Sequence, residues 1–214
     1  MDEFDVVKKL AQGGQGSTLL VKKKSGSHVF VLKQCKCENI GEANNALKEA
    51  KVLQALSHSH IVRYNDVFLH EDGRFLVICT LMEHCQGGDL ACYLSDIKAK
   101  QKRLEERTIA RWAGEIMDAL GYIHGREIVH RDVKPLNVFI NSSGEMKLGD
   151  FGLALSTRRN DATTQVGTPA YLAPEVLQHE EYGHAVDCWG GGCILLEMMT
   201  LDFLWDRRGL LALQ

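Results

Sequence analysis

The chain has 214 residues, of which 45% are hydrophobic and 25% charged, and its formal net charge is −3 at pH 7. This composition suits one large or two small globular domains, and the near-neutral charge gives no reason to expect nucleic-acid binding. No apolar run approaches the roughly 20 residues that span a bilayer, so membrane insertion is not expected.

The N-terminus and the cysteines indicate the compartment. The first residues lack the basic start and apolar core of a signal peptide, so export is not expected. Seven cysteines make an odd count, and Cys35 and Cys37 lack the companion ligands of a zinc site. We therefore expect reduced, mostly buried thiols and a cytoplasmic protein.

Short strands and one helix are predicted up to about Met82. Strand patterns cover residues 4–10, 17–22 and 28–34, and two later strands meet at an Asp72-Gly73 hairpin. Between these two groups of strands, a helix is predicted over about 43–56. The helix prediction rests on apolar residues at helical spacing: Ala46, Leu47, Ala50, Leu53 and Leu56.

A glycine-rich turn joins the first two strands, in the sequence Leu10-Ala-Gln-Gly-Gly-Gln-Gly-Ser-Thr18. Glycines there let backbone N–H groups approach phosphates, although a plain flexible turn has the same pattern. Lys33 in the third strand and Glu49 in the helix follow it. In this order a lysine can pair with phosphates while a glutamate orients the lysine, which favours a nucleotide site over two unrelated surface charges.

Helices are predicted beyond Met82. One apolar stripe predicts a long helix over about 108–124: Ile109, Trp112, Ala113, Ile116, Leu120 and Ile123. A short polar segment containing Gly87 and Gly88 interrupts the pattern and is the predicted hinge. The predicted domains are therefore an N-terminal lobe at 1–82, a hinge at 83–89 and a C-terminal lobe at 90–214.

The run from 128 to 140 carries Asp132, Lys134 and Asn137, and Asp150 follows one hairpin later in an Asp-Phe-Gly set. A loop aspartate can accept a hydroxyl proton, and a nearby lysine can neutralise a transferring phosphate. An asparagine and a second aspartate offer hard oxygens to magnesium. The full spacing is typical of a protein kinase catalytic loop, whereas a lone His-Arg-Asp tripeptide also occurs in solvated loops.

These motifs, with Met82-Glu-His-Cys-Gln-Gly-Gly-Asp-Leu90 and Gly167-Thr-Pro-Ala-Tyr-Leu-Ala-Pro-Glu175, resemble those of eukaryotic serine/threonine protein kinases, and in particular of the NIMA-related group. The resemblance implies an α+β, protein-kinase-like bilobal fold. Its small antiparallel β-rich N-lobe would contain one helix, and its larger, mainly helical C-lobe would be incomplete. ATP and Mg²⁺ are the implied cofactors, and Ser or Thr hydroxyls of protein substrates are the implied acceptors.

The resemblance also implies a role for each motif residue. Asp132 would position and deprotonate the acceptor hydroxyl, and Lys134 would stabilise the transferring phosphoryl group. Asn137 and Asp150 would carry magnesium. The implied nucleotide-binding residues are Ala11, Gly13, Gly16, Thr18, Val31, Lys33, Glu49, Met82, Glu83, Cys85, Asp89 and Phe139.

An activation segment is implied between Asp150 and Glu175. A phosphate on Thr164, or on its neighbour Thr163, is one hypothesis; on Thr164 it would pair with Arg131 and order the segment. A solvated loop that is never modified is the alternative. The resemblance further implies that Thr168 favours Ser/Thr specificity, that His130 is structural, and that one apolar stack contains Leu53, Tyr64, His130 and Phe151, anchored by Asp187.

Several residues depart from the family pattern. Ala11 replaces a glycine, and Gly190 and Gly191 replace a serine and a bulky apolar residue, at about 1 kcal/mol for each extra helical glycine. The sequence after Leu201 stops where the family continues, so an Arg partner for Glu175 is missing. We therefore expect a fragment, a truncated product or an unstable isoform.

Alternative functions stay open at this stage. A catalytically impaired pseudokinase or nucleotide-binding scaffold has the same motifs with an altered glycine turn. A P-loop NTPase is excluded because no Gly-Lys-Ser/Thr follows the glycine turn. An aminoglycoside-type phosphotransferase is disfavoured by the Ala-Pro-Glu motif that ends at Glu175. The protein substrate and any regulatory partner are not indicated.

Overall fold

The computed structural model describes residues 3–13, 16–73, 75–151, 155–156 and 169–202. It divides into two compact units. Unit 1 comprises Met1–His58 and Val62–His84, and unit 2 comprises Ser59–Ile61 and Cys85–Gln214. One unit is mainly strands and the other mainly helices, so the α+β class is confirmed.

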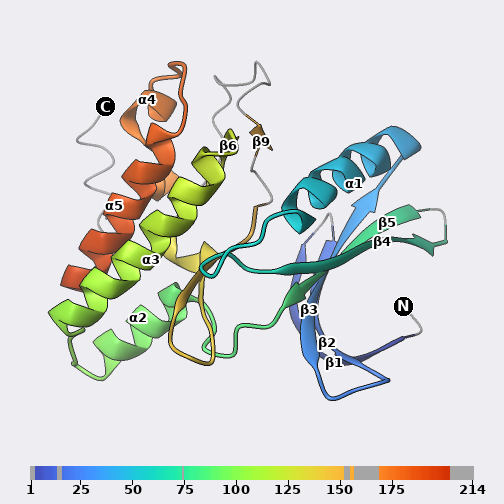
Figure 1. The fold of residues 1–214 in the computed structure, drawn as a ribbon, viewed down its shortest axis with the longest axis horizontal. Helices are drawn as coiled ribbons and strands as arrows, with labels where there is room; N and C mark the ends of the chain where they lie inside the picture. The colour runs from blue at the N-terminus through green and yellow to red at the C-terminus, as the bar shows by residue number, and fades with distance from the viewer. Residues whose placement is uncertain (1–2, 14–15, 74, 152–154, 157–168, 203–214) are drawn as a thin grey trace. The chain divides into compact units, whose positions relative to one another are not determined.

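Unit 1 is built on a five-stranded antiparallel sheet with strand order β1-β2-β3-β5-β4 (Figure 1). The strands are β1 (Phe4–Gly13), β2 (Gly16–Lys23), β3 (Val29–Cys37), β4 (Tyr64–Asp72) and β5 (Phe75–Glu83). The first three run further than predicted. In β1 the reason is that pairing with β2 continues to Gly13 through two β-bulges, which break the alternation that marks a strand in sequence.

Apolar side chains occupy both faces of this sheet. One face holds a core of five buried residues: Val21, Leu32, Val77, Cys79 and Leu81. On the other face, Ala43 of helix α1 (Ile40–Gln54) packs with Cys37 and Ile78. The helix begins three residues earlier than predicted because the Asn39 side chain accepts a hydrogen bond from the Glu42 amide, 2.9 Å away. A polar cap of this kind does not contribute to apolar periodicity.

Unit 2 contains α2 (Leu90–Ala99), α3 (Glu106–His124), α4 (Pro174–Leu177) and α5 (Ala185–Thr200). Helices α3 and α5 run side by side (Figure 1). The predicted stripe on α3 is largely confirmed, because Trp112, Ile116, Leu120 and Ile123 are buried. The short elements that follow are β6 (Ile128–Val129), η1 (Pro135–Asn137), β7 (Val138–Ile140), β8 (Met146–Leu148), β9 (Leu155–Ser156) and η2 (Pro169–Tyr171).

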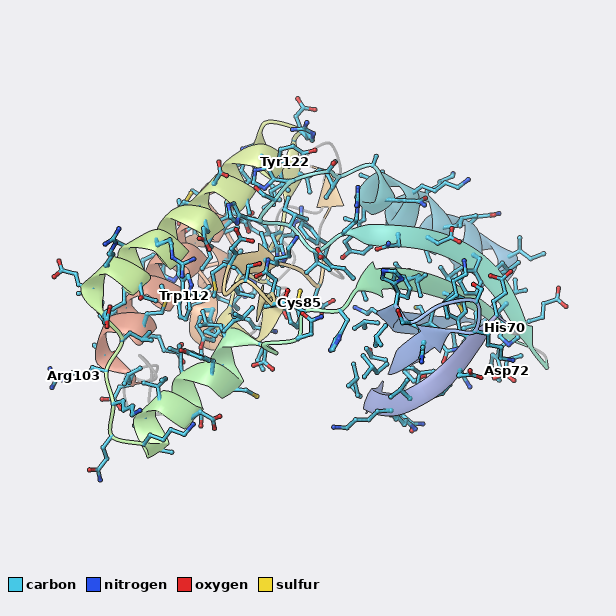
Figure 2. All side chains as sticks on the ribbon, turned by 60° about the horizontal axis from the view of Figure 1, so that its bottom comes forward. His70, Asp72, Cys85, Arg103, Trp112 and Tyr122 are labelled. Atoms are coloured by element: carbon cyan, nitrogen blue, oxygen red, sulfur yellow. The ribbon has the colours of Figure 1, made fainter. Side chains whose placement is uncertain are left out.

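The β7–β8 hairpin is fixed to α3 by polar side chains. The indole Nε1 of Trp112 donates to the Gly144 carbonyl at 3.0 Å, from a ring that Figure 2 labels on α3. One helical turn on, the Glu115 carboxylate accepts from the Met146 amide at 2.7 Å. Because this hairpin connects the sequence-predicted residues Asn137 and Asp150, its attachment to α3 limits their relative movement.

The cysteines and the helices bear on two further expectations. All seven thiols are free, but Cys35, Cys92 and Cys188 are exposed, so the expectation of mostly buried thiols holds only for the other four. Burial raises the pKa of the Cys79 and Cys193 thiols. Within the described ranges, no helix combines the length and the apolarity needed to cross a membrane.

The glycine run in α5 has a packing role at its first position. A Cβ on Gly190 would lie 2.7 Å from the carbonyl oxygen of Val133, closer than real contacts allow. At Gly191 the nearest atom would be the flexible Met117 sulfur at 3.2 Å, and at Gly192 nothing lies within 4 Å among the described residues. Glycine at position 190 is therefore expected to lower helix stability, but it also allows α5 to approach the loop containing Val133 closely.

Alanine substitutions should separate these two effects. Gly190→Ala is expected to lower the free energy of unfolding by about 1–3 kcal/mol, because backbone atoms must shift to admit the methyl group. Gly192→Ala is expected to raise it by about 0.5–1 kcal/mol through backbone entropy alone. Urea unfolding followed by circular dichroism measures both, and an equal gain for the two variants would contradict the close contact at Gly190.

Candidate active site

The predicted catalytic side chains Asp132, Lys134 and Asn137 come together in the loop between β6 and β7. Lys134 Nζ lies 2.6 Å from Asp132 Oδ2, and the two side chains are 15% and 12% exposed. Asn137 Nδ2 donates to the Asp132 carbonyl oxygen at 2.8 Å and to its Oδ2 at 2.9 Å. The carboxylate is thus fixed by two donors while remaining partly accessible to solvent.

A buried polar frame holds this loop from behind. Asp187 of α5 is 1% exposed, and its two oxygens accept from the backbone amides of His130 and Arg131, each at 2.8 Å. Its Oδ2 also accepts from His124 Nε2 of α3, at 2.8 Å. Arg131 adopts φ 67°, a strained value for a side-chain-bearing residue, so the frame stabilises a backbone turn that the loop would not favour alone. The predicted anchoring role of Asp187 is confirmed.

His130 is fully buried and acts as a structural bridge. Burial lowers the pKa of its imidazole despite the neighbouring Asp187, so the ring is neutral at pH 7. Its Nε2 lies 2.9 Å from the Gly149 carbonyl and must donate, which leaves Nδ1 to accept from the Asp132 amide at 3.3 Å. The ring also contacts Phe151, with centroids 4.6 Å apart. His130 and Phe151, two of the four residues of the predicted apolar stack, therefore lie within unit 2.

Asp150 is positioned next to Asn137 through the backbone. The Gly149 amide donates to the Asn137 carbonyl at 2.8 Å, and Asp150 itself adopts φ 53° with an exposed side chain. Because both amide hydrogens of Asn137 point to Asp132, the oxygen of that amide is its acceptor for a cation. An amide oxygen and a carboxylate are ligands that suit Mg²⁺ with additional water or phosphate oxygens. The described residues form no cluster of three or more His, Cys, Asp or Glu that could hold a metal alone.

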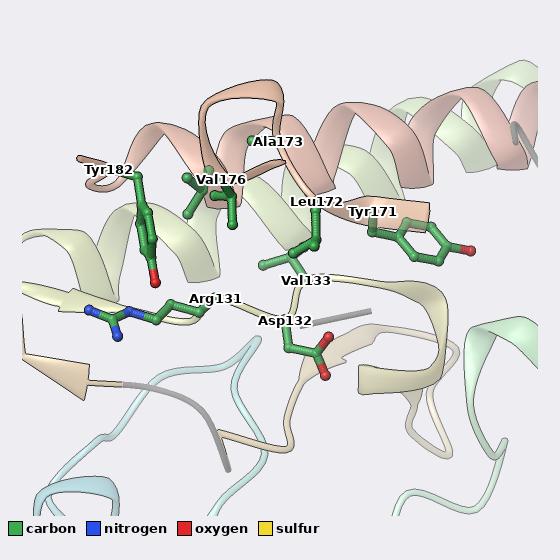
Figure 3. A pocket seen from close by; sticks show the side chains of 9 residues that line it. Arg131, Asp132, Val133, Tyr171, Leu172, Ala173, Val176 and Tyr182 are labelled. Carbon is green, nitrogen blue, oxygen red and sulfur yellow. The ribbon is translucent and has the colours of Figure 1, made fainter. Parts of the chain in front are cut away.

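A pocket opens beside this loop. Its lining consists of Arg131, Asp132, Val133, Tyr171, Leu172, Ala173, Val176, Tyr182 and Val186 (Figure 3). The Arg131 side chain extends toward Tyr182, with the guanidinium carbon 5.2 Å from the ring centroid. Arg131 is 7% exposed, and its Nε and one terminal nitrogen have no hydrogen-bond partner among the described residues. A buried cation of this kind suits an anion.

In unit 1, five of the predicted nucleotide-binding residues share one sheet face. Thr18 stands opposite Ala11 on one side and opposite Lys33 on the other, and Val31 stands opposite Met82. Strand neighbours two apart point to the same side, so these five residues line one surface, the face that α1 also covers. Glu49 lies on α1 with an exposed side chain. A pairing of Lys33 with Glu49 stays a prediction.

The glycine turn is described only at its ends. Gly13 pairs with Gly16 across β1 and β2. A Cβ on Gly16 would lie 1.8 Å from the Gln34 carbonyl oxygen, so strand packing already requires glycine there. This structural reason accounts for Gly16 without a phosphate, and a phosphate role for the turn stays a prediction.

The predicted hinge residues have defined backbone partners. The Glu83 amide donates to the Arg63 carbonyl at 2.9 Å, so only the Glu83 carbonyl can serve an adenine edge. The Cys85 carbonyl accepts from Gly88. Asp89 is the N-cap of α2, its side chain accepting from the Cys92 amide at 2.8 Å, and it forms a bridge with Phe139 of β7. The Asp89 carboxylate therefore has a structural role whether or not it also meets a ribose.

The activation segment is described only in part, at residues 150–151, 155–156 and 169–175. Thr163, Thr164 and Thr168 lie outside the described residues. Glu175 is half-buried in the first turn of α4, and no ion pair of its carboxylate is found within the described part of the chain.

Comparison with known proteins decides the family. The family model described as the protein kinase domain matches residues 4–210 of this chain. This chain belongs to the protein kinase family. Membership of this family explains both the kinase motifs predicted from sequence and the polar loop around Asp132. It also confirms the predicted protein-kinase-like fold.

Several curated kinases resemble this kinase chain over most of its length. The probable serine/threonine-protein kinase nek2 of Dictyostelium discoideum is 37% identical over 208 residues, 94% of this chain and 49% of the relative. Human serine/threonine-protein kinase Nek5 is 37% identical over 215 residues, 98% of this chain and 30% of the relative. Human RAC-beta serine/threonine-protein kinase is 35% identical over 204 residues, 93% of this chain and 41% of the relative.

These relatives confirm the predicted resemblance to NIMA-related serine/threonine kinases. The RAC-beta match shows that a similar likeness extends to other serine/threonine kinases. The chain spans half or less of the length of these relatives.

Two polar pairs of the kinase site were missed by sequence reasoning. Tyr171 donates to the Glu197 carboxylate at 2.7 Å, and burial, reinforced by Glu197, raises the pKa of this phenol. His124 stacks on His184 with centroids 4.5 Å apart. No local motif marks either pair, because their members are separated by 26 and 60 residues along the chain. Correlated substitutions at these pairs of positions among homologous sequences would be the signal that reveals them.

Proposed function

We propose that this chain carries the catalytic domain of an ATP-dependent serine/threonine protein kinase. The arrangement that carries the proposal is the carboxylate of Asp132 fixed by Lys134 at 2.6 Å and Asn137 at 2.9 Å. The reaction would transfer the γ-phosphoryl group of ATP to a Ser or Thr hydroxyl. Its substrates would be proteins, and its proposed location is the cytoplasm.

The loop residues would act mainly by alignment and charge. A carboxylate oxygen of Asp132 would orient the acceptor hydroxyl and accept its proton as the oxygen–phosphorus bond forms. The Lys134 ammonium, already beside Asp132, would face the phosphoryl oxygens and reduce their repulsion with the carboxylate. Bound Mg²⁺, held by Asn137 and Asp150, would neutralise phosphate charge. Lys33 and the residues sharing its sheet face would hold the nucleotide.

A catalytically impaired pseudokinase or nucleotide-binding scaffold is the second candidate, favoured by Ala11 in place of the first glycine. A single-turnover assay separates the two functions. The chain is mixed in excess with radiolabelled ATP, magnesium and a generic basic Ser/Thr protein. Label appearing on serine or threonine supports the kinase, whereas ATP binding by fluorescence without any transfer would support the scaffold.

We further propose that Arg131 receives a phosphate on the activation segment, at Thr163 or Thr164. Its buried nitrogens lack partners among the described residues, and a phosphate would supply charge-assisted hydrogen bonds worth about 1.5–3 kcal/mol each. Arg131→Ala should therefore reduce the activity of the phosphorylated chain about tenfold or more, and leave the phosphatase-treated chain little changed. Initial rates before and after phosphatase treatment measure the difference.

The matched control is Thr163→Ala and Thr164→Ala in the Arg131→Ala background. If the phosphate acts through Arg131, removing the threonines from this variant has no further effect. Active chain that carries no phosphate on either threonine by mass spectrometry would exclude the regulatory proposal without affecting the proposed reaction.

A further inference from the structure

Two histidines from different helices stack behind the catalytic loop. His184, the N-cap residue of α5, lies against His124 near the end of α3, with ring centroids 4.5 Å apart and planes inclined by 22°. His124 in turn donates from Nε2 to Asp187, whose two oxygens accept from the amides of His130 and Arg131. A continuous series of contacts therefore connects His184 to the residue that precedes Asp132.

His184 has an unusual polar environment. Its Nε2 is buried and has no hydrogen-bond partner among the described residues. A hydrogen on that nitrogen would be a buried donor without an acceptor, which is costly, so the ring fits its place as the neutral tautomer with the proton on Nδ1. Among the described residues, the His184 side chain makes no hydrogen bond to the loop. Its contribution is the face that it presents to His124.

We propose that His184 is a positioning residue that holds His124 against Asp187. The test of this inference by enzyme activity rests on the proposed kinase function, whereas the test by amide exchange does not. The ring of His184 limits the rotation of His124, so that Nε2 stays directed at Asp187. Asp187 then keeps the strained turn at Arg131 in the geometry that orients Asp132.

Amide exchange of the loop tests the positioning role directly. In His184→Ala the stack is lost, and the amides of His130 and Arg131 should exchange with deuterium roughly five- to tenfold faster at pH 7. In His184→Phe an uncharged ring keeps the stack, and exchange should stay at the wild-type rate. The matched control is His28→Ala, an exposed histidine of unit 1, which should leave both amides unchanged.

Steady-state kinetics at pH 7 give a second test of the positioning role. The kcat of His184→Ala should be roughly tenfold lower than that of wild type with an unchanged KM for ATP, and His184→Phe should keep the wild-type kcat.

The outcomes separate this inference from the proposed function. Unchanged exchange in His184→Ala would overturn the positioning role. Faster exchange in His184→Ala that His184→Phe restores would support it even if no variant transferred phosphate, and that result would count against the kinase proposal alone.

Discussion

Replacing Asp187 with alanine is expected to lower the free energy of unfolding by about 3–5 kcal/mol, because one side chain satisfies three donors in the interior of unit 2. The amides of His130 and Arg131 and the Nε2 of His124 would all lose their acceptor. Each buried donor left without a partner costs about 1–3 kcal/mol, and water entering the new space would recover part of that loss. Urea unfolding followed by tryptophan fluorescence measures the change.

The control for Asp187→Ala is Asp96→Ala. Asp96 is exposed on α2, and its substitution should change the free energy of unfolding by less than about 0.5 kcal/mol. Asp187→Asn should fall between the two, since its single oxygen can still accept from a backbone amide. An Asp187→Ala variant as stable as wild type would mean that the loop keeps its geometry without this carboxylate.

The parts of the fold with local periodicity could be predicted from sequence. The stripe on α3 recurs every three or four residues, and the turn at Asp72-Gly73 is specified by two adjacent residues, so both were found near their observed positions. The site around Asp132 was predictable for the same reason. Asp132, Lys134 and Asn137 are close in sequence, and a three-residue η1 turn brings their side chains together.

Features that depend on contact between distant segments could not be predicted. The start of α1 is set by the Asn39 cap, which apolar spacing does not reveal. Gly190 was expected only to weaken α5, whereas its main physical consequence is the close approach of Val133, 57 residues earlier in the chain. The orphaned nitrogens of Arg131 likewise result from burial under Tyr182, which no local pattern encodes.

Replacing Asp132 with asparagine should reduce kcat by about 10²–10⁴-fold, the range lost when a positioned base is removed. The amide can still accept hydrogen bonds, so Asn137 would keep a partner for its Nδ2 and the loop should remain folded. It cannot accept the hydroxyl proton, and the 2.6 Å ion pair with Lys134 would be lost. Because the side chains proposed to bind the nucleotide are unchanged, the Kd of ATP should stay within about twofold of wild type. Single-turnover phosphoryl transfer and equilibrium ATP binding measure the two quantities separately.

The chain offers a matched control in Asp202→Asn, which removes a carboxylate from another lysine pair, the exposed one with Lys98. An exposed pair contributes little, so this variant should retain both kcat and stability. Equal loss in the two variants would show that removing any paired aspartate impairs the chain. An Asp132→Asn variant that kept more than about a tenth of wild-type kcat would instead show that proton acceptance by Asp132 contributes little to the rate. Catalysis would then depend on Lys134, Asn137 and Asp150 through alignment and charge, and Lys134→Ala would become the more damaging substitution.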